Sequence, residues 1–155
     1  MTELSGDGLR ALVVDDDQPI RHMLRAMLEL EGWEVLEAED GAQALAMAEA
    51  EKPHGIVLDV MMPVKDGFEV LSELRQTEHG RQMAVVMLTA KTRSADILRG
   101  TRLGADHYVT KPFDPGGVIE RLAFHALRRN PGARTQGELP VRAGRRRPAR
   151  KPRPG

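Results

Sequence analysis

The sequence predicts an α/β fold in which a doubly wound, five-stranded parallel sheet is covered by five helices. Short apolar segments alternate five times along the chain with segments of helical period, the pattern of a parallel sheet with helices on both faces. Carboxylates and other polar groups directly follow several of the apolar segments, as they do at the strand ends of such sheets. The 155 residues suit one ordinary domain.

The first half of the chain supplies three of the predicted strands. The segment ALVVDD, residues 11–16, is the first, and apolar residues then recur at helical spacing up to Gly32, a typical helix stop. Residues 33–38, WEVLEA, alternate like a second strand. The Ala-rich residues 41–51 favour a helix, and GIVLD, residues 55–59, is the third strand.

The second half completes the alternation. Apolar spacing over residues 68–74 predicts a third helix, and AVVMLTA, residues 84–90, predicts the fourth strand. A more polar helix follows over 94–103, and residues 106–113 contain a short fifth strand and a turn. Asp114 as N-cap, with a proline after it, then opens a last helix.

The net charge of zero is the sum of an acidic part and a basic part of the chain. Residues 1–127 contain 13 Lys and Arg against 22 Asp and Glu, whereas residues 128–155 contain 10 against 1. Residues 130–155 are rich in Pro, Gly and Arg and have few apolar residues, so we expect a disordered basic tail. The predicted organisation is a flexible N-terminus over 1–8, a folded domain over 9–129 and that tail.

Composition narrows the class of protein further. Cysteine is absent, which excludes disulfides and thiolate metal sites within this sequence. No apolar run approaches the about 18 residues that span a bilayer, and the start MTELSGDGLR lacks the features of a signal peptide. We therefore expect a cytoplasmic protein that does not enter the membrane.

Polar side chains gather where four of the predicted strands end. The first strand ends in Asp15 and Asp16, the third in Asp59 and the fourth in Thr89, and the fifth runs into Lys111. Ligands of open parallel sheets bind beyond these carboxyl ends, so we expect the five side chains to share one site.

The residue types in this cluster favour phosphoryl transfer. Mg²⁺ prefers oxygen ligands and keeps several waters, so two or three carboxylates suffice to hold it. A carboxylate beside the metal can attack phosphorus, while a cation such as Lys111 neutralises the phosphoryl oxygens and the Thr89 hydroxyl donates to them. The charge at the end of an otherwise apolar strand indicates that Asp59 is the nucleophile.

Four segments resemble the receiver domain of bacterial two-component response regulators: ALVVDDD, IVLDVMMPVKDGFEV, VVMLTA and GADHYVTKPF. The resemblance covers about residues 9–129. It implies a flavodoxin-like fold with strand order 2-1-3-4-5. It also implies a signalling switch that catalyses only its own phosphorylation and dephosphorylation.

The resemblance implies a role for each site residue. Asp59 is the phospho-acceptor, Thr89 the switch hydroxyl, Lys111 the phosphate-binding lysine and Tyr108 an aromatic switch. It further implies a cis peptide bond between Lys111 and Pro112.

A divalent metal site is part of the same resemblance. Asp16, Asp59 and the main-chain carbonyl of Met61 are the direct ligands of Mg²⁺ or Mn²⁺, and Asp15 acts mainly through water. Met61 offers no side chain that positions an attacking water, which suggests slow self-dephosphorylation.

The implied partners are proteins. The phosphoryl group comes from the phosphohistidine of a sensor histidine kinase or phosphotransfer protein, and the face formed by 94–103, the fifth strand and the last helix controls a downstream protein. In winged-helix relatives this face dimerises through charged pairs, where the present chain has residues such as Ile97, His107 and Gly117. A monomer and a phosphorylation-dependent dimer both stay open.

Two other functions compete with this interpretation. Asp15 and Asp17 form an Asp-x-Asp pair after a strand, as in Mg-dependent phosphohydrolases of the haloacid dehalogenase type, although Asp17 also suits a helix cap. The basic tail, including residues 145–147, could bind nucleic acid. Without aromatic residues in the tail such binding would be non-specific.

Overall fold

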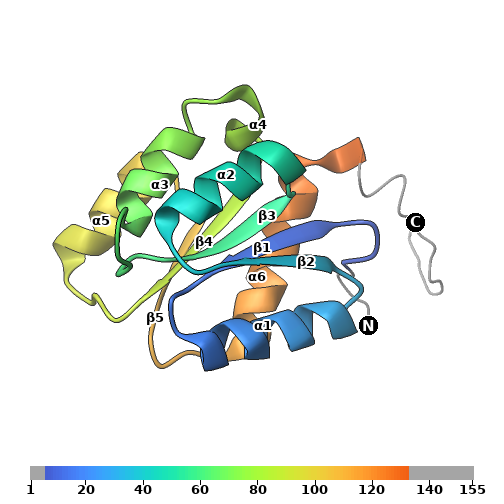
Figure 1. Ribbon diagram of the computed structural model, residues 1–155, viewed down its shortest axis with the longest axis horizontal. Helices are drawn as coiled ribbons and strands as arrows, with labels where there is room; N and C mark the ends of the chain where they lie inside the picture. Colours follow the sequence, from blue (N-terminus) through green and yellow to red (C-terminus); the bar gives the residue numbers. More distant parts are fainter. Residues whose placement is uncertain (1–5, 133–155) are drawn as a thin grey trace, which may run out of the picture.

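A computed structural model describes residues 6–132 of the chain. Five strands form one sheet in the order β2-β1-β3-β4-β5, with every neighbouring pair parallel (Figure 1). The strands are β1 (Arg10–Val14), β2 (Glu34–Ala38), β3 (Gly55–Asp59), β4 (Ala84–Thr89) and β5 (His107–Thr110). The helices are α1 (Gln18–Leu30), α2 (Gly41–Glu51), α3 (Gly67–Leu74), α4 (Glu78–Arg81), α5 (Ser94–Leu103) and α6 (Pro115–Arg129). The predicted fold class and strand order are confirmed.

The described residues contain six helices where the sequence predicted five. The additional one is α4, a single turn of four residues that follows α3 closely. Thr77 caps it by accepting a hydrogen bond from the Gly80 N–H at 2.9 Å. One turn is too short to show a helical period in the sequence. The helices expected over 94–103 and from residue 115 are therefore α5 and α6.

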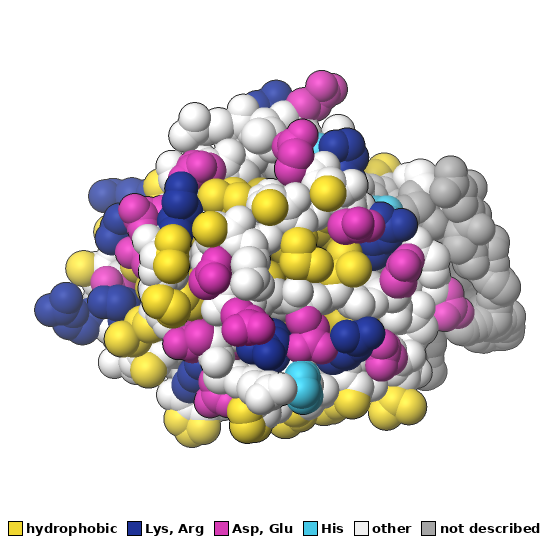
Figure 2. Space-filling model, viewed as in Figure 1, with side chains coloured by type: hydrophobic (Ala, Val, Ile, Leu, Met, Phe, Trp, Pro, Cys, Tyr) yellow, Lys and Arg dark blue, Asp and Glu magenta, His cyan; other side chains and the backbone are white. Residues whose placement is uncertain are grey.

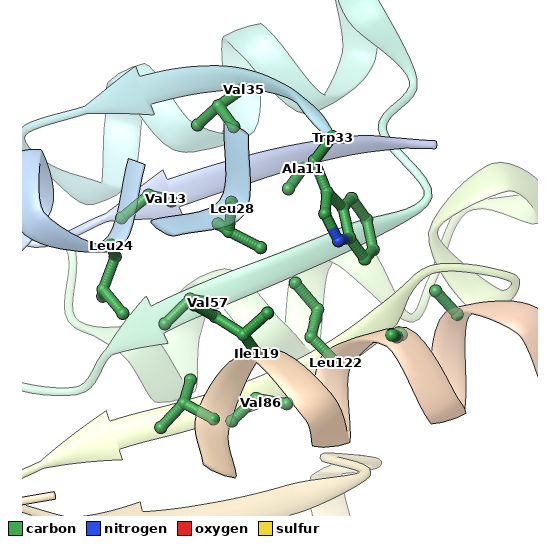
Figure 3. Close-up of a cluster of buried hydrophobic side chains, with 14 of the residues drawn as sticks. Ala11, Val13, Leu24, Leu28, Trp33, Val35, Val57, Val86, Ile119 and Leu122 are labelled. Atoms are coloured by element: carbon green, nitrogen blue, oxygen red, sulfur yellow. The ribbon is translucent and has the colours of Figure 1, made fainter. Parts of the chain in front are cut away.

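The helices cover the sheet in two layers, with α1 and α6 on one face and α2, α3 and α5 on the other (Figure 1). Because successive side chains of a buried parallel strand point to opposite faces, each strand supplies both layers. In β1, Ala11 and Val13 join the cluster under α1 and α6, whereas Leu12 and Val14 join the other. Figure 3 shows the first cluster, in which Trp33 packs beside Leu122.

Four aspartates fix where helices begin. Asp17, Asp40, Asp66 and Asp114 each accept a hydrogen bond from a backbone N–H in the first turn of α1, α2, α3 and α6. Asp66 also forms a reciprocal capping box with Glu69. The caps predicted at Asp17 and Asp114 are confirmed.

A half-buried ionic network lies at the amino-terminal edge of the sheet, away from the strand ends that carry the polar cluster. Asp106 accepts from the Val85 N–H at 2.9 Å and from Arg129 at 2.8 Å, and Arg75 lies 3.4 Å from the same carboxylate. Arg75 also donates to the carbonyl of Gly104 at 2.7 Å. This network joins α3, β4, the start of β5 and α6.

The surface around the edge strand β2 carries interspersed acidic and basic side chains (Figure 2). Arg10 pairs with Glu34 at 3.2 Å and Arg25 with Glu37 at 2.9 Å, which places charges along an edge that could otherwise pair with another strand. Within residues 6–132 no helix has the length and apolar character to cross a bilayer. The predicted tail lies almost entirely outside the described residues, as does most of the predicted N-terminal segment.

Candidate functional site

The fold brings the predicted polar cluster together at the carboxyl edge of the sheet. Asp59 is the last residue of β3 and Thr89 the last of β4, while Asp15 follows β1 and Lys111 follows β5. The strand order reverses between β1 and β3, and such a switch point is where open parallel sheets bind ligands. The site thus lies where the sequence placed it.

Lys111 lies between two buried carboxylates. Its Nζ atom is 3.1 Å from Asp15 Oδ2 and 3.6 Å from Asp59 Oδ2. Both aspartate side chains are almost fully buried, with 1% and 4% of their surface exposed. The peptide bond that follows Lys111 is cis, as the resemblance implied.

The site holds more negative charge than one lysine offsets. Burial, and then the charge of Asp15, raise the pKa of Asp59 to about 7 against an ordinary value of 3.8. Burial of the ammonium lowers the pKa of Lys111, but the Asp59 and Asp15 carboxylates outweigh that effect, so its pKa lies above the usual value. Charge repulsion among the carboxylates therefore favours a bound cation.

The carboxylates also satisfy the geometry of a divalent metal site. Asp15, Asp16 and Asp59 each offer one oxygen atom, and these atoms all lie within 4.8 Å of one another. Asp16 is exposed, whereas Asp15 already accepts from the Asp17 N–H at 2.9 Å and from Lys111. Hard carboxylate oxygens at this spacing fit a divalent metal ion, and Asp16 is the exposed member of the three.

The segment after Asp59 holds that side chain in place. The Met61 N–H donates to Asp59 Oδ1 at 3.2 Å, and the Gly67 N–H donates to the Val60 carbonyl at 2.9 Å. A Cβ atom on Gly67 would lie only 2.4 Å from the Asp59 carbonyl oxygen, so only glycine fits where α3 begins against the strand end. The side chain of Met61 points outward and is 54% exposed.

Thr89 and Tyr108 are linked through one residue. The Thr89 side chain is fully buried, and its Oγ1 atom accepts from the Lys91 N–H at 3.2 Å. The Tyr108 hydroxyl donates to the Lys91 carbonyl at 3.2 Å. The two side chains implied as switches thus contact the same residue of the β4–α5 loop.

Asp17 does not contribute to this cluster. Its carboxylate accepts from the Ile20 N–H at 3.2 Å and caps α1. The phosphohydrolase interpretation needs both members of the Asp15 and Asp17 pair at the site, so the structure does not support it.

Arg21 of α1 also supports the site, although its sequence position did not predict this role. Its guanidinium donates to the Asp15 carbonyl at 2.7 Å and to Glu37 at 2.8 Å. Arg21 precedes the buried Leu24 and Leu28 at helical spacing, and that spacing could have identified it as a core-facing residue.

Comparison with known proteins agrees with this geometry. The response regulator receiver domain family matches residues 11–123. The chain is 39% identical to the phosphate regulon transcriptional regulatory protein PhoB of Pseudomonas aeruginosa over 137 residues, covering 88% of this chain and 58% of PhoB. It is 45% identical over 130 residues to the alkaline phosphatase synthesis transcriptional regulatory protein PhoP of Bacillus subtilis, covering 84% of this chain and 53% of PhoP.

The fold also matches solved structures. The Francisella response regulator 1452 receiver domain superimposes with a TM-score of 0.72 at 32% identity, covering 77% of this chain and 98% of that domain. The present chain spans about half the length of the two curated relatives. Its match with most of a solved receiver domain, and with the receiver family over most of its own length, shows that the chain belongs to the response regulator receiver domain family.

Proposed function

We propose that the receiver domain accepts a phosphoryl group on Asp59 from the phosphohistidine of a sensor histidine kinase or phosphotransfer protein. Receiver domains are signalling switches that interact with histidine kinases and downstream effectors. The observation that carries the assignment is the position of Asp59, a buried carboxylate at a strand end with Lys111 Nζ 3.6 Å away and Asp15 beside it.

The transfer uses the side chains at the carboxyl edge of the sheet. An oxygen of Asp59 forms a bond to phosphorus as the phosphorus–nitrogen bond of the phosphohistidine breaks. The bonding electrons return to the imidazole nitrogen, and Asp59 becomes an acyl phosphate. Lys111 neutralises charge on the transferred group, and the Thr89 hydroxyl donates a hydrogen bond to it.

Receiver domains typically bind a divalent metal ion at their aspartate cluster, and we assign Mg²⁺ or Mn²⁺ to this one. Asp16, Asp59 and the Met61 carbonyl would hold the ion directly, and Asp15 would act through water. When bound, the ion would neutralise charge on the phosphoryl oxygens. The oxygens of Asp15 accept from the Asp17 N–H and from Lys111.

The same residues are proposed to catalyse dephosphorylation, in which water attacks the acyl phosphate and frees the Asp59 carboxylate. The side chain two residues after Asp59 borders the path of that water. Met61 is apolar and offers it no hydrogen bond, so we expect the phosphorylated form to persist.

The proposed output is a change in the surface formed by α5, β5 and α6. Thr89 moves toward the phosphoryl group, and its contact with Lys91 connects that movement to Tyr108 on β5. The changed surface would control a partner protein, either as a monomer or as a phosphorylation-dependent dimer. The curated relatives are transcriptional regulators about one and a half times as long as the present chain.

Intact-mass spectrometry tests the proposal. The protein is incubated with Mg²⁺ and acetyl phosphate, and the wild type is compared with Asp59→Asn and Asp17→Asn. We expect one phosphoryl adduct on the wild type and on Asp17→Asn, removed by hydroxylamine as an acyl phosphate, and none on Asp59→Asn. An adduct of equal yield on Asp59→Asn would refute the assignment.

A further inference from the structure

Helix α5 is attached to the domain over a small area. The Arg99 guanidinium lies 4.4 Å over the Phe68 ring of α3, and Leu103 packs against the cluster under α2, α3 and α5. Gly100 is the one buried residue of this helix, and the N-cap residue Arg93 supplies no side-chain hydrogen bond. Ile97 and Leu98 are 37% and 48% exposed. A helix held over so small an area can shift as a unit when the residues beneath Gly100 move.

The residue beneath Gly100 is Tyr108. A methyl group on Gly100 would lie 2.9 Å from Cδ2 and 3.2 Å from Cε2 of the Tyr108 ring, and 3.2 Å from Met87 Sδ. Met87 is fully buried and has no room to retreat. Any side chain at position 100 must therefore displace the tyrosine ring.

The opposite end of Tyr108 connects to the phospho-acceptor site. Its hydroxyl donates to the Lys91 carbonyl, in the loop that leads into α5, and the Lys91 N–H donates to Thr89 Oγ1. Tyr108 thus contacts α5 at its middle through Gly100 and just before its start through Lys91. Both contacts lie between Thr89 and α5.

We propose that Gly100 is the positioning residue for Tyr108: its missing side chain provides the space in which the ring lies under α5, and this contact transmits phosphorylation from the Thr89 end to α5. The inference rests on the proposed phospho-acceptor function of Asp59. A side chain at position 100 leaves the chemistry of Asp59 unchanged and disconnects α5 from it.

The chain contains one tyrosine, so 3-fluorotyrosine labelling gives a single ¹⁹F resonance that reports on this ring. Spectra of the wild type, Gly100→Ala and Gly116→Ala are recorded without and with Mg²⁺ and beryllofluoride, a phosphoryl mimic. Gly116→Ala is the matched control because a Cβ there would meet only Asp114 Oδ1, at 3.7 Å.

We expect the wild type and Gly116→Ala to share one resonance and the same change on adding beryllofluoride. In Gly100→Ala the resonance should move in the resting protein and lose its response, while acetyl phosphate still gives the wild-type yield of phosphorylated protein. A wild-type resonance and response in Gly100→Ala would overturn the proposal.

Thermal denaturation separates this inference from the proposed function. Alanine favours a helix over glycine, so once Tyr108→Ala removes the ring, Gly100→Ala should raise Tm by about 3 °C, whereas with Tyr108 present it should lower Tm. If Gly100→Ala changes Tm equally with Tyr108 present and in the Tyr108→Ala variant, the packing role of Gly100 is refuted, whether or not Asp59 is phosphorylated. If the wild type takes no phosphoryl group, the proposed function and the transmission role fail together, while this cycle still decides whether Gly100 positions Tyr108.

Discussion

Replacing Asp59 by asparagine should stabilise the metal-free protein, and the gain should grow with pH. The folded protein raises the pKa of Asp59 from 3.8 to about 7, which means that it binds this proton more tightly than the unfolded chain does. The stability contributed by protonated Asp59 is therefore fully present below pH 3.8 and is lost as the pH rises through about 7. Asparagine is uncharged at low and at high pH, so the Asp59→Asn variant does not lose stability in this way.

The size of the effect follows from that pKa difference. One pH unit between the two pKa values is worth about 1.4 kcal/mol. At pH 5 the wild type has lost about one pH unit's worth of this stabilisation, and at pH 8 it has lost all of it. The free energy of unfolding of Asp59→Asn should therefore exceed that of the wild type by about 2–3 kcal/mol more at pH 8 than at pH 5. Added Mg²⁺ should remove much of this advantage, since it binds the wild-type carboxylates and stabilises the folded state.

Urea unfolding in EDTA, followed by the fluorescence of the buried Trp33, measures the free energy of unfolding of the wild type and of Asp59→Asn at each of the two pH values. Asp40→Asn is the control, because Asp40 caps α2 through the Gln43 N–H and asparagine caps equally well. The wild type and this control should show the same pH trend. A constant difference between wild type and Asp59→Asn at both pH values would refute the repulsion described for this site.

Two further substitutions test other parts of the structure. Met61→Asn should shorten the lifetime of the phosphorylated form several-fold, measured by loss of the intact-mass adduct after donor removal, because the amide can hold an attacking water where the half-exposed methionine cannot; an unchanged lifetime would count against this role. Asp106→Asn should lower the free energy of unfolding by about 2–4 kcal/mol, since it leaves Arg75 and Arg129 without their carboxylate. Glu29→Gln, which breaks only the exposed pair with Arg25, should cost about 0.5 kcal/mol or less in the same urea titration, and equal losses in the two variants would contradict the network.

The sequence predicted the sheet well because parallel strands are buried on both faces and read as continuous apolar runs. Residues 55–59 were predicted as a strand and are β3. The short fifth strand expected within 106–113 is β5, His107–Thr110, which lies at the sheet edge and runs directly into the turn at Lys111. The helix α4 has only four residues, too few for a helical repeat of apolar residues to appear in the sequence.

The polar cluster was predictable because the carboxyl ends of parallel strands converge by topology alone. The network of Asp106 with Arg75 and Arg129 was not predictable, since the two arginines lie 31 and 23 residues from Asp106 and all three are of types common among surface charges. The close approach of Tyr108 to Gly100 was equally hidden. A glycine within a helical segment signals a packing constraint, but only the structure shows which side chain fills the space.

Reduction of the phosphorylated protein with borohydride identifies the residue that carries the phosphoryl group, which we propose is Asp59. The reagent converts an aspartyl phosphate to homoserine, which peptide sequencing by mass spectrometry locates at a single residue. We predict homoserine at position 59, formed only after treatment with acetyl phosphate and Mg²⁺. Homoserine at position 15, with Asp59 intact, would contradict the account and favour a phosphohydrolase-like nucleophile at the end of β1.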